Sequence, residues 1–250
     1  MKVLLTISLL IITILTAFGV GSCTVEENAA EFEAVSDEPD HVFNSNSNAN
    51  DTIIALPEPE EGQKTLIENL SQRVSRRNFS SEGLTLSQVS SLLWAAGGSP
   101  LDGVSGATRT APSAGGAYPL EIYLVAGVGI EGLEAGIYRY AYNDHTLTAV
   151  AGDDRREQLA ASALDQAFIA EAPINIVLVA YYERTTQRYG DRGTRYVHMD
   201  AGYASQNIYL MAEDLDLGTV AVGAFDDIET ADVLETDGAP LKIMPVGNLN

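Results

Sequence analysis

Residues 111–119 read Ala-Pro-Ser-Ala-Gly-Gly-Ala-Tyr-Pro, a run in which most side chains are small. Backbone amides in such a run lie open to close approach by a flat ligand, because glycine and alanine cover little of the chain. Upstream, residues 73–79 read Arg-Val-Ser-Arg-Arg-Asn-Phe. Arginine supplies both charge and a rigid fork of donors, which is what a phosphate dianion requires. The two stretches predict the ring end and the phosphate end of one flavin site.

The charge of the chain limits its partners. Of 250 residues 46% are hydrophobic, enough for one good core. Lys and Arg number 14 against 35 Asp and Glu, which gives a formal net charge of −21. That field repels nucleic acid and anionic lipid headgroups, so we expect neither as a main partner. A local cluster of arginines is informative because it opposes the prevailing sign.

Other site classes lack their motifs. Cys23 is the only cysteine, and His41, His145 and His198 are scattered. An intrachain disulfide is therefore excluded, and we expect no metal site, since no His-Glu-x-x-His or Cys-x-x-Cys spacing occurs. Gly-x-Ser-x-Gly, the usual elbow of serine hydrolases, is also missing.

The first 22 residues predict an export signal. Lys2 precedes an apolar run, Val3–Val20, which small residues follow. Residues 20–23, Val-Gly-Ser-Cys, resemble a prokaryotic lipobox, in which Cys23 becomes the lipid-bearing first residue. We expect an extracytoplasmic lipoprotein anchored to the membrane. The alternatives are a plain signal peptide, which implies secretion, and an uncleaved anchor helix.

Residues 23–52 predict a tether, and residues 53–250 the globular domain. The tether is rich in Glu and Asp, and residues 44–50 read Asn-Ser-Asn-Ser-Asn-Ala-Asn. Such a segment buries too little apolar surface to offset the entropy of the chain.

Helical and strand patterns alternate imperfectly along the domain. Residues 85–88, Thr-Leu-Ser-Gln, form a capping-box pattern that opens a helix, which Gly97 ends. Ile174–Tyr181 is an apolar run typical of a strand covered on both faces. This alternation favours a three-layer α+β domain with helices on both sides of a central sheet. We also expect helices near 63–72, 155–170, 196–215 and 226–234, and strands near 120–126, 136–142 and 219–224.

One motif is misleading. Residues 127–132 read Gly-Val-Gly-Ile-Glu-Gly and fit the dinucleotide fingerprint Gly-x-Gly-x-x-Gly. That fingerprint requires a helix to begin at the loop, with its N-terminus facing a pyrophosphate. Only three residues separate it from Gly136–Tyr140, which alternates as a strand does. The stretch therefore predicts a hairpin loop and not a Rossmann fold.

The order of motifs resembles the nitroreductase superfamily, and within it the SagB/ThcOx branch of azoline peptide dehydrogenases. The N-terminal signature is Arg73-x-Ser75-x-Arg77-x-Phe79, and the further matches span about 190 residues; residues 1–52 lie outside. The resemblance implies a central, mostly antiparallel sheet flanked by helices, a homodimer, and FMN. The further matches are Leu92–Gly97, Arg109–Tyr123, Gly136–Tyr140, Gln206-Asn207, Leu217-Gly218, Val222–Asp227 and Met244–Gly247.

The resemblance also assigns the contacts to FMN. Arg73, Ser75 and Arg77 would hold the phosphate; the alternative is a basic helix end that complements the local dipole. Gly223 and Ala224 match the place where the superfamily offers a backbone N–H to flavin N5. The ring loop comprises Pro112, Ser113, Ala114 and Gly115, for which an ordinary glycine turn is the alternative. Gln206 and Asn207 face the site in this interpretation, or bond neighbouring backbone as core amides.

Two departures from the family pattern concern the phosphate. Residue 74 is Val where relatives often carry a second basic residue, and the chain reaches Asn250 without the basic residue that many nitroreductases place there. We therefore expect a modest affinity for FMN.

The resemblance implies a flavin enzyme without a catalytic side chain of its own. Hydride exchange at N5 would proceed in two steps, with a small molecule or a peptide as substrate. Export would place the protein away from NAD(P)H, which counts against the alternative of a nicotinamide-dependent nitroreductase. A membrane-tethered module that binds a flavin or another planar cofactor without turnover is the other alternative.

Overall fold

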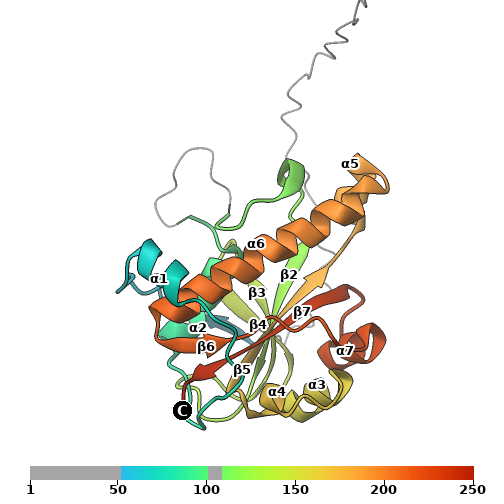
Figure 1. Ribbon diagram of the computed structural model, residues 1–250. Coiled ribbons are helices and arrows are strands. Elements are labelled where there is room, and N and C mark those ends of the chain that lie inside the picture. The colour runs from blue at the N-terminus through green and yellow to red at the C-terminus, as the bar shows by residue number, and fades with distance from the viewer. Residues whose placement is uncertain (1–51, 101–108) are drawn as a thin grey trace, which may run out of the picture. The chain divides into compact units, whose positions relative to one another are not determined.

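One antiparallel sheet organises the domain. The computed structural model describes residues 52–100 and 109–250, which belong to one compact unit. The strands of this part of the chain follow the order β1-β4-β3-β2-β5-β7-β6, and every pair is antiparallel (Figure 1). They are β1 (Ile53–Ala55), β2 (Leu120–Ala126), β3 (Gly136–Ala141), β4 (Thr146–Ala151), β5 (Ile174–Ala180), β6 (Leu217–Thr219) and β7 (Ala239–Asn248).

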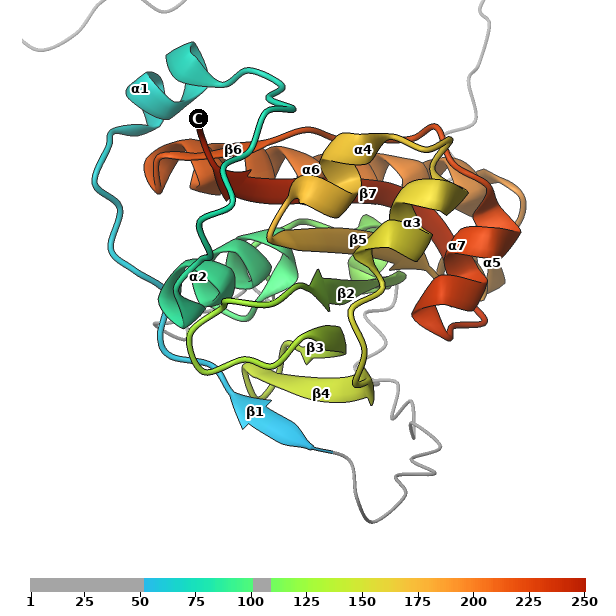
Figure 2. The ribbon, with the colours of Figure 1, turned by 90° about the horizontal axis from the view of Figure 1, so that it is seen from below.

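Helices cover both faces of the sheet, as Figure 2 shows, and the expected three-layer α+β architecture is confirmed. Helices α2 and α6 pack on one face, and α3, α4 and α7 lie on the other; α1 rests against α6. The helices are α1 (Leu66–Gln72), α2 (Leu86–Gly97), α3 (Arg156–Ser162), α4 (Ala167–Glu171), α5 (Glu183–Tyr189), α6 (Arg192–Asp214) and α7 (Asp227–Leu234), with a 3-10 turn, η1, at Ala114–Gly116.

Strand β5 lies inside the sheet, between β2 and β7, and both of its faces are apolar. Ile176 and Leu178 belong to the core under α2 and α6, whereas Val177 and Val179 belong to the core under α3, α4 and α7. All seven residues of β5 are buried. The expectation of a strand covered on both faces is confirmed.

The capping box of α2 is present. The Thr85 hydroxyl accepts a hydrogen bond from the Gln88 amide at 3.1 Å, and the Gln88 side chain accepts one from the Thr85 amide at 3.0 Å. Helix α2 ends at Gly97, as its sequence predicts. Such caps satisfy backbone donors at the start of a helix and stabilise it by about 1 kcal/mol.

The dinucleotide-like stretch is a hairpin loop. It connects β2 to β3, which are paired and antiparallel. Gly129 and Gly132 have φ values of +91° and +74°, which a side chain would disfavour. The rejection of a Rossmann fold is confirmed.

Three expected elements differ from the structure. The helix near 155–170 divides into α3 and α4, because Leu164 and Asp165 adopt left-handed backbone with φ of +59° and +55°. The strand near 219–224 ends at Thr219, since the Ala221 amide donates to the Tyr209 hydroxyl and not to a neighbouring strand. The long helix α6 begins at Arg192, four residues earlier than expected.

The N-terminal predictions fall almost entirely on residues that the structure does not describe. These are the export signal (1–22) with Cys23 and all of the tether except Thr52. Within residues 52–100 and 109–250, no helix combines the length and apolarity needed to cross a membrane.

Helix α1 is held by polar contacts. The Asp214 carboxylate, at the end of α6, accepts hydrogen bonds from the amides of Gln63 and Lys64, both at 3.0 Å, and from the Asn69 side chain at 2.9 Å. Leu66, Ile67 and Leu70, which the helical spacing places on one face of α1, are instead exposed, at 62%, 79% and 52%. No part of the described chain covers this apolar face.

We expect Asp214→Ala to lower the free energy of unfolding by about 2–4 kcal/mol, because it leaves buried donors without an acceptor. Burial opposes ionisation of Asp214, but the hydrogen bonds from Asn69, Lys64 and Gln63 outweigh it and hold the pKa below its usual range. The native state therefore binds this proton more weakly than the unfolded state. The contribution is present at neutral pH and is lost as the pH falls through the lowered pKa.

Chemical denaturation of the variant between neutral and acidic pH measures both effects. The exposed Asp144, changed to Ala, is the control, because it lies far from α1 in the sequence and forms no ion pair with another described residue. A loss in Asp214→Ala no larger than in the control would show that this carboxylate does not hold α1.

Candidate functional site

The predicted phosphate stretch runs along the edge of the sheet. The Arg76 amide donates to the Thr219 carbonyl of β6 at 2.9 Å, and Phe79 forms a bridge with Leu249 after β7. The Val74 amide donates to the buried Glu213 carboxylate at 3.2 Å. Residues 73–79 are thus fixed by backbone contacts, and their side chains are left for other partners.

The predicted phosphate ligands contact two different aromatic residues, Tyr209 on α6 and Phe168 on α4. The Arg73 guanidinium lies over the Tyr209 ring, 5.1 Å from its centroid, and the Ser75 and Tyr209 hydroxyl oxygens are 2.9 Å apart. The Arg77 guanidinium instead lies 5.8 Å from the centroid of the Phe168 ring, on α4. Arg73 is also the C-cap residue of α1, so the alternative of a basic helix end stays open for it.

Arg73 and Arg77, the two arginines of the signature, differ from the intervening Arg76 in their ion pairs. Arg76 forms an ion pair with Glu213 at 3.5 Å. Arg73 and Arg77 form no ion pair with a carboxylate of residues 52–100 or 109–250. Among the described residues, the same holds for Arg109, Arg188, Arg192, Arg195 and Lys242. Arg73 and Arg77 are distinguished by flanking Ser75 in one short stretch, and in a chain of net charge −21 such a pair favours an anion.

Glycine is required in the predicted ring loop. Gly115 has a φ of +61°, and a Cβ there would lie 2.3 Å from the Tyr189 hydroxyl and 2.9 Å from an Arg188 nitrogen. The Arg188 guanidinium also donates to the Gly115 carbonyl at 3.2 Å. The end of α5 therefore packs directly on this loop, which excludes a larger residue.

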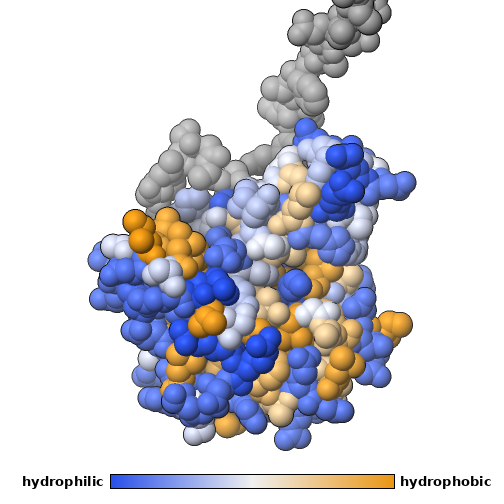
Figure 3. Space-filling view, viewed as in Figure 1, coloured by the Kyte–Doolittle hydropathy of each residue, from blue (hydrophilic) through white to orange (hydrophobic). Residues whose placement is uncertain are grey.

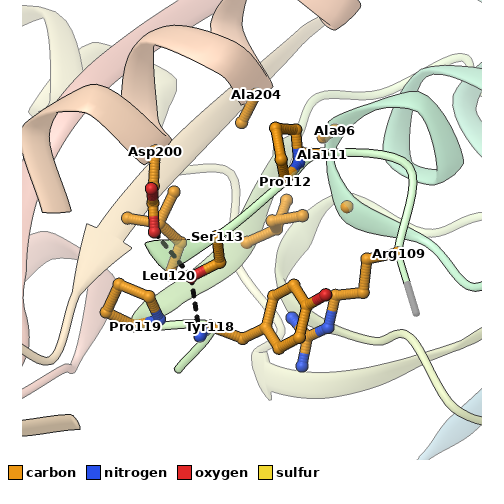
Figure 4. A pocket seen from close by; sticks show the side chains of 12 residues that line it. Ala96, Arg109, Ala111, Pro112, Ser113, Tyr118, Pro119, Leu120, Asp200 and Ala204 are labelled. Carbon is orange, nitrogen blue, oxygen red and sulfur yellow. Dashed lines mark hydrogen bonds between the residues drawn. The ribbon is translucent and has the colours of Figure 1, made fainter. Parts of the chain in front are cut away.

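Asp200 of α6 organises the same loop, as the dashed lines in Figure 4 show for Ser113. The Ser113 hydroxyl donates to the Asp200 carboxylate at 2.6 Å and accepts from the Tyr118 amide at 2.9 Å. The Ala114 amide also hydrogen-bonds this carboxylate. One hydroxyl and one amide that were assigned to the flavin ring thus have a partner within the protein.

A small pocket lies behind the loop, between α2, β2 and α6. Ala96, Ile122 and Ala204 give it apolar walls, and Arg109 and Asp200 also line it (Figure 4). The Arg109 guanidinium lies near two aromatic rings, 4.3 Å from the centroid of Tyr118 and 3.3 Å from that of Tyr142. Burial lowers the pKa of Arg109 below its usual value.

The two predicted amides of α6 have different surroundings. The Asn207 side chain donates to the carbonyls of Ala95, at 3.0 Å, and Thr110, at 3.2 Å. It acts as the core amide of the alternative interpretation. Gln206 is exposed, and its side chain makes no hydrogen bond with another described residue.

Gly223 and Ala224 are exposed after a bridge at Val222. Neither amide N–H donates to another described residue, and the Ala224 carbonyl accepts from the Gln166 side chain at 3.1 Å. A Cβ on Gly223 would lie 3.1 Å from the Lys242 ammonium nitrogen. These N–H groups are therefore free to donate a hydrogen bond, as a contact with flavin N5 requires.

Tyr209 joins two parts of the predicted site. Its hydroxyl accepts from the Ala221 amide at 2.8 Å and contacts Ser75, so the phosphate stretch and residues 221–224 are connected through one side chain. The ring loop is held separately by Asp200, nine residues earlier on α6 and about 13 Å along the helix axis. The sequence patterns singled out neither Asp200 nor Tyr209. The available signal was the helical spacing of Asp200 with the buried Ala204 and of Tyr209 with the buried Ala212.

Comparison with known proteins places this geometry in a family. The sequence model of the Nitroreductase family matches residues 70–248. The chain belongs to the nitroreductase family. The sequence resemblance is confirmed at this level, and family membership supports an oxidoreductase that uses a flavin.

Individual nitroreductase relatives agree. A Methanocaldococcus jannaschii protein named as a nitroreductase is 45% identical over 194 residues, 78% of this chain and 95% of its own. A Ralstonia eutropha structure described as a nitroreductase is 30% identical, with a TM-score of 0.68 over 79% of this chain and 90% of its own. The Escherichia coli microcin synthetase McbBCD, solved with truncated pro-MccB17, gives 25% identity and a TM-score of 0.62 over 78% of each chain.

We expect the ionisation of Asp200 to cost folding free energy. Burial raises its pKa, and the hydrogen bonds from Ser113 and Ala114 only partly oppose this. Since the native state binds this proton more tightly than the unfolded state, stability falls as the pH rises through the raised pKa. Asp200→Asn should therefore become more stable relative to the wild type as the pH rises from acidic to neutral values.

Denaturation curves across this range, with Asp144→Asn as the exposed control, provide the test. A stability difference that stays constant with pH, or that changes in the opposite direction, would contradict the assignment.

Proposed function

We propose that this protein is an FMN-dependent oxidoreductase of the SagB/ThcOx type. The observation that carries the proposal is the pair of arginines, Arg73 and Arg77, which have no carboxylate partner in the described part of an acidic chain. Their guanidinium groups lie within cation–π range of aromatic rings, 5.1 and 5.8 Å from the ring centroids, and their N–H donors have no carboxylate acceptor among the described residues. Family membership and the similarity to the microcin synthetase support the rest.

The residues fit FMN at both ends. In this proposal Arg73, Ser75 and Arg77 bind the phosphate. The free N–H groups of Gly223 and Ala224 face N5, and the loop from Pro112 to Gly115 lies at the ring edge. The exposed position of Gly223 is a feature of a backbone that a flat ring approaches closely, whereas the space beside Gly115 is taken by Tyr189 and Arg188.

FMN, when bound, supplies the acceptance and donation of hydride at N5. The chain itself positions the phosphate, offers backbone N–H groups to the ring and orients the substrate. Donor and acceptor would use the same face in turn, which gives two-step kinetics. We propose a small molecule or a peptide as substrate, and the peptide-bound microcin synthetase supports the second.

Replacing either Arg73 or Arg77 with Ala should weaken FMN binding by about 10- to 100-fold, because a charge-assisted hydrogen bond contributes about 1.5–3 kcal/mol. Riboflavin, which lacks the phosphate, should bind the variants as well as it binds the wild type. Titration of the purified protein, followed by the visible absorption of the flavin, measures both affinities.

Arg139→Ala, a half-exposed arginine on β3, controls for the loss of one positive charge. Unchanged FMN affinity in both site variants would discard the phosphate assignment. A wild-type protein that binds no flavin would overturn the proposed function itself. Binding without any redox cycling by donor and acceptor pairs would instead favour a non-catalytic binding module.

We also propose a homodimer, supported by apolar surface on two helices. Ile67 and Leu70 are exposed on α1, and Figure 3 shows the hydrophobic group there. Met199 and Tyr203, four residues apart on α6, are 47% and 48% exposed. Apolar faces of this kind on helices are typical of surfaces that bury against another chain.

Ile67→Asp should shift the protein from dimer to monomer. Replacing an isoleucine that is buried in the proposed dimer with a charged residue costs about 2–3 kcal/mol. This weakens association by about 30- to 150-fold. Sedimentation velocity at several concentrations measures this, with the exposed Ile228→Asp on α7 as the matched control. Equal association of the two variants would exclude α1 from the interface.

We propose that the protein is located outside the cytoplasm, as a lipoprotein anchored to the membrane through Cys23. NAD(P)H is not expected there, so we propose an electron partner other than a nicotinamide. In this proposal the electron partner distinguishes the protein from a nicotinamide-dependent nitroreductase of the same fold.

A further inference from the structure

We propose that Tyr209 is a positioning residue that assembles the phosphate end of the site; this inference rests on the proposed function. Three contacts meet on its side chain, which is only 9% exposed. The ring lies under the Arg73 guanidinium, and the hydroxyl contacts both the Ser75 hydroxyl and the Ala221 amide.

The direction of the hydrogen bonds gives Tyr209 its role. The Ala221 N–H donates to the Tyr209 oxygen at 2.8 Å. The Ser75 and Tyr209 hydroxyl oxygens are 2.9 Å apart, and we assign Tyr209 as the donor of this pair because its oxygen already accepts from Ala221. Ser75 keeps its own proton, which it can donate to a phosphate oxygen. The tyrosine hydroxyl thereby converts Ser75 from a free rotor into an oriented donor.

The ring of Tyr209 acts on Arg73. A guanidinium stacked on an aromatic face gains cation–π stabilisation and keeps its in-plane N–H donors free. Without a carboxylate partner among the described residues, Arg73 depends on this ring for its position. The same side chain also ties Ala221 to the phosphate stretch, two residues before Gly223.

Tyr209→Phe separates these effects, since it removes the hydroxyl and keeps the ring. We expect FMN affinity to fall about tenfold, the effect of losing one oriented hydrogen bond, with riboflavin affinity unchanged. Ser75→Ala should cause a similar loss, and the double variant should lose little more, because both changes remove the same donor. Tyr203→Phe, an exposed tyrosine on the same helix, is the matched control.

Fluorescence titration with FMN and with riboflavin distinguishes the outcomes. Wild-type FMN affinity in Tyr209→Phe would overturn the inference, as would an equal loss for both flavins, which indicates a general structural role. Additive losses in the double variant would also overturn it. If Tyr209→Phe does not fold, an undiminished preference for FMN over riboflavin in Ser75→Ala refutes the inference, and a lost preference supports it. A wild-type protein without flavin binding refutes the proposed function as well.

Discussion

Buried polar side chains need hydrogen-bond partners, and those on α6 determine how the rest of this domain packs around the helix. A buried carboxylate, amide or hydroxyl without a partner costs several kcal/mol, so each such group on α6 must attract another segment of the chain. These contacts reach the ring loop, the end of α2, the phosphate stretch and the approach to α1. The pairs are Asp200 with Ser113, Asn207 with Ala95 and Thr110, Tyr209 with Ser75 and Ala221, Glu213 with Val74 and Arg76, and Asp214 with Gln63, Lys64 and Asn69.

The proposed phosphate end is distinguished by the clustering of its cations. Arg155, Arg156 and Arg184 each form an ion pair at 2.6–2.7 Å, as expected in a chain with many carboxylates. Arg73 and Arg77 form none within the described chain, a property they share with Arg188, Arg192 and Arg195. They differ from these in flanking Ser75 in one short stretch, where two cations and a hydroxyl donor can act on one phosphate.

Local patterns predicted the elements whose signals lie within a few residues. The capping box of α2, its end at Gly97 and the buried strand β5 depend on neighbouring residues alone, and each occurs as expected. One error has a long-range cause: the strand near 219–224 is interrupted because Tyr209 takes the Ala221 amide. Long-range contacts also decide how α1 is held, since the Asp214 carboxylate anchors this segment while its apolar face stays exposed.

Composition, spacing and short-range order were enough to give the charge, the fold class, the family motifs and the residue types available for a flavin. They also indicated Arg73, Ser75 and Arg77 as a group. The folded domain shows in addition that Asn207 bonds core carbonyls, that Asp200 holds the ring loop, and that Tyr209 connects Ser75 to Ala221. Such contacts join residues between 12 and 134 positions apart, and no local pattern encodes which buried donor meets which acceptor.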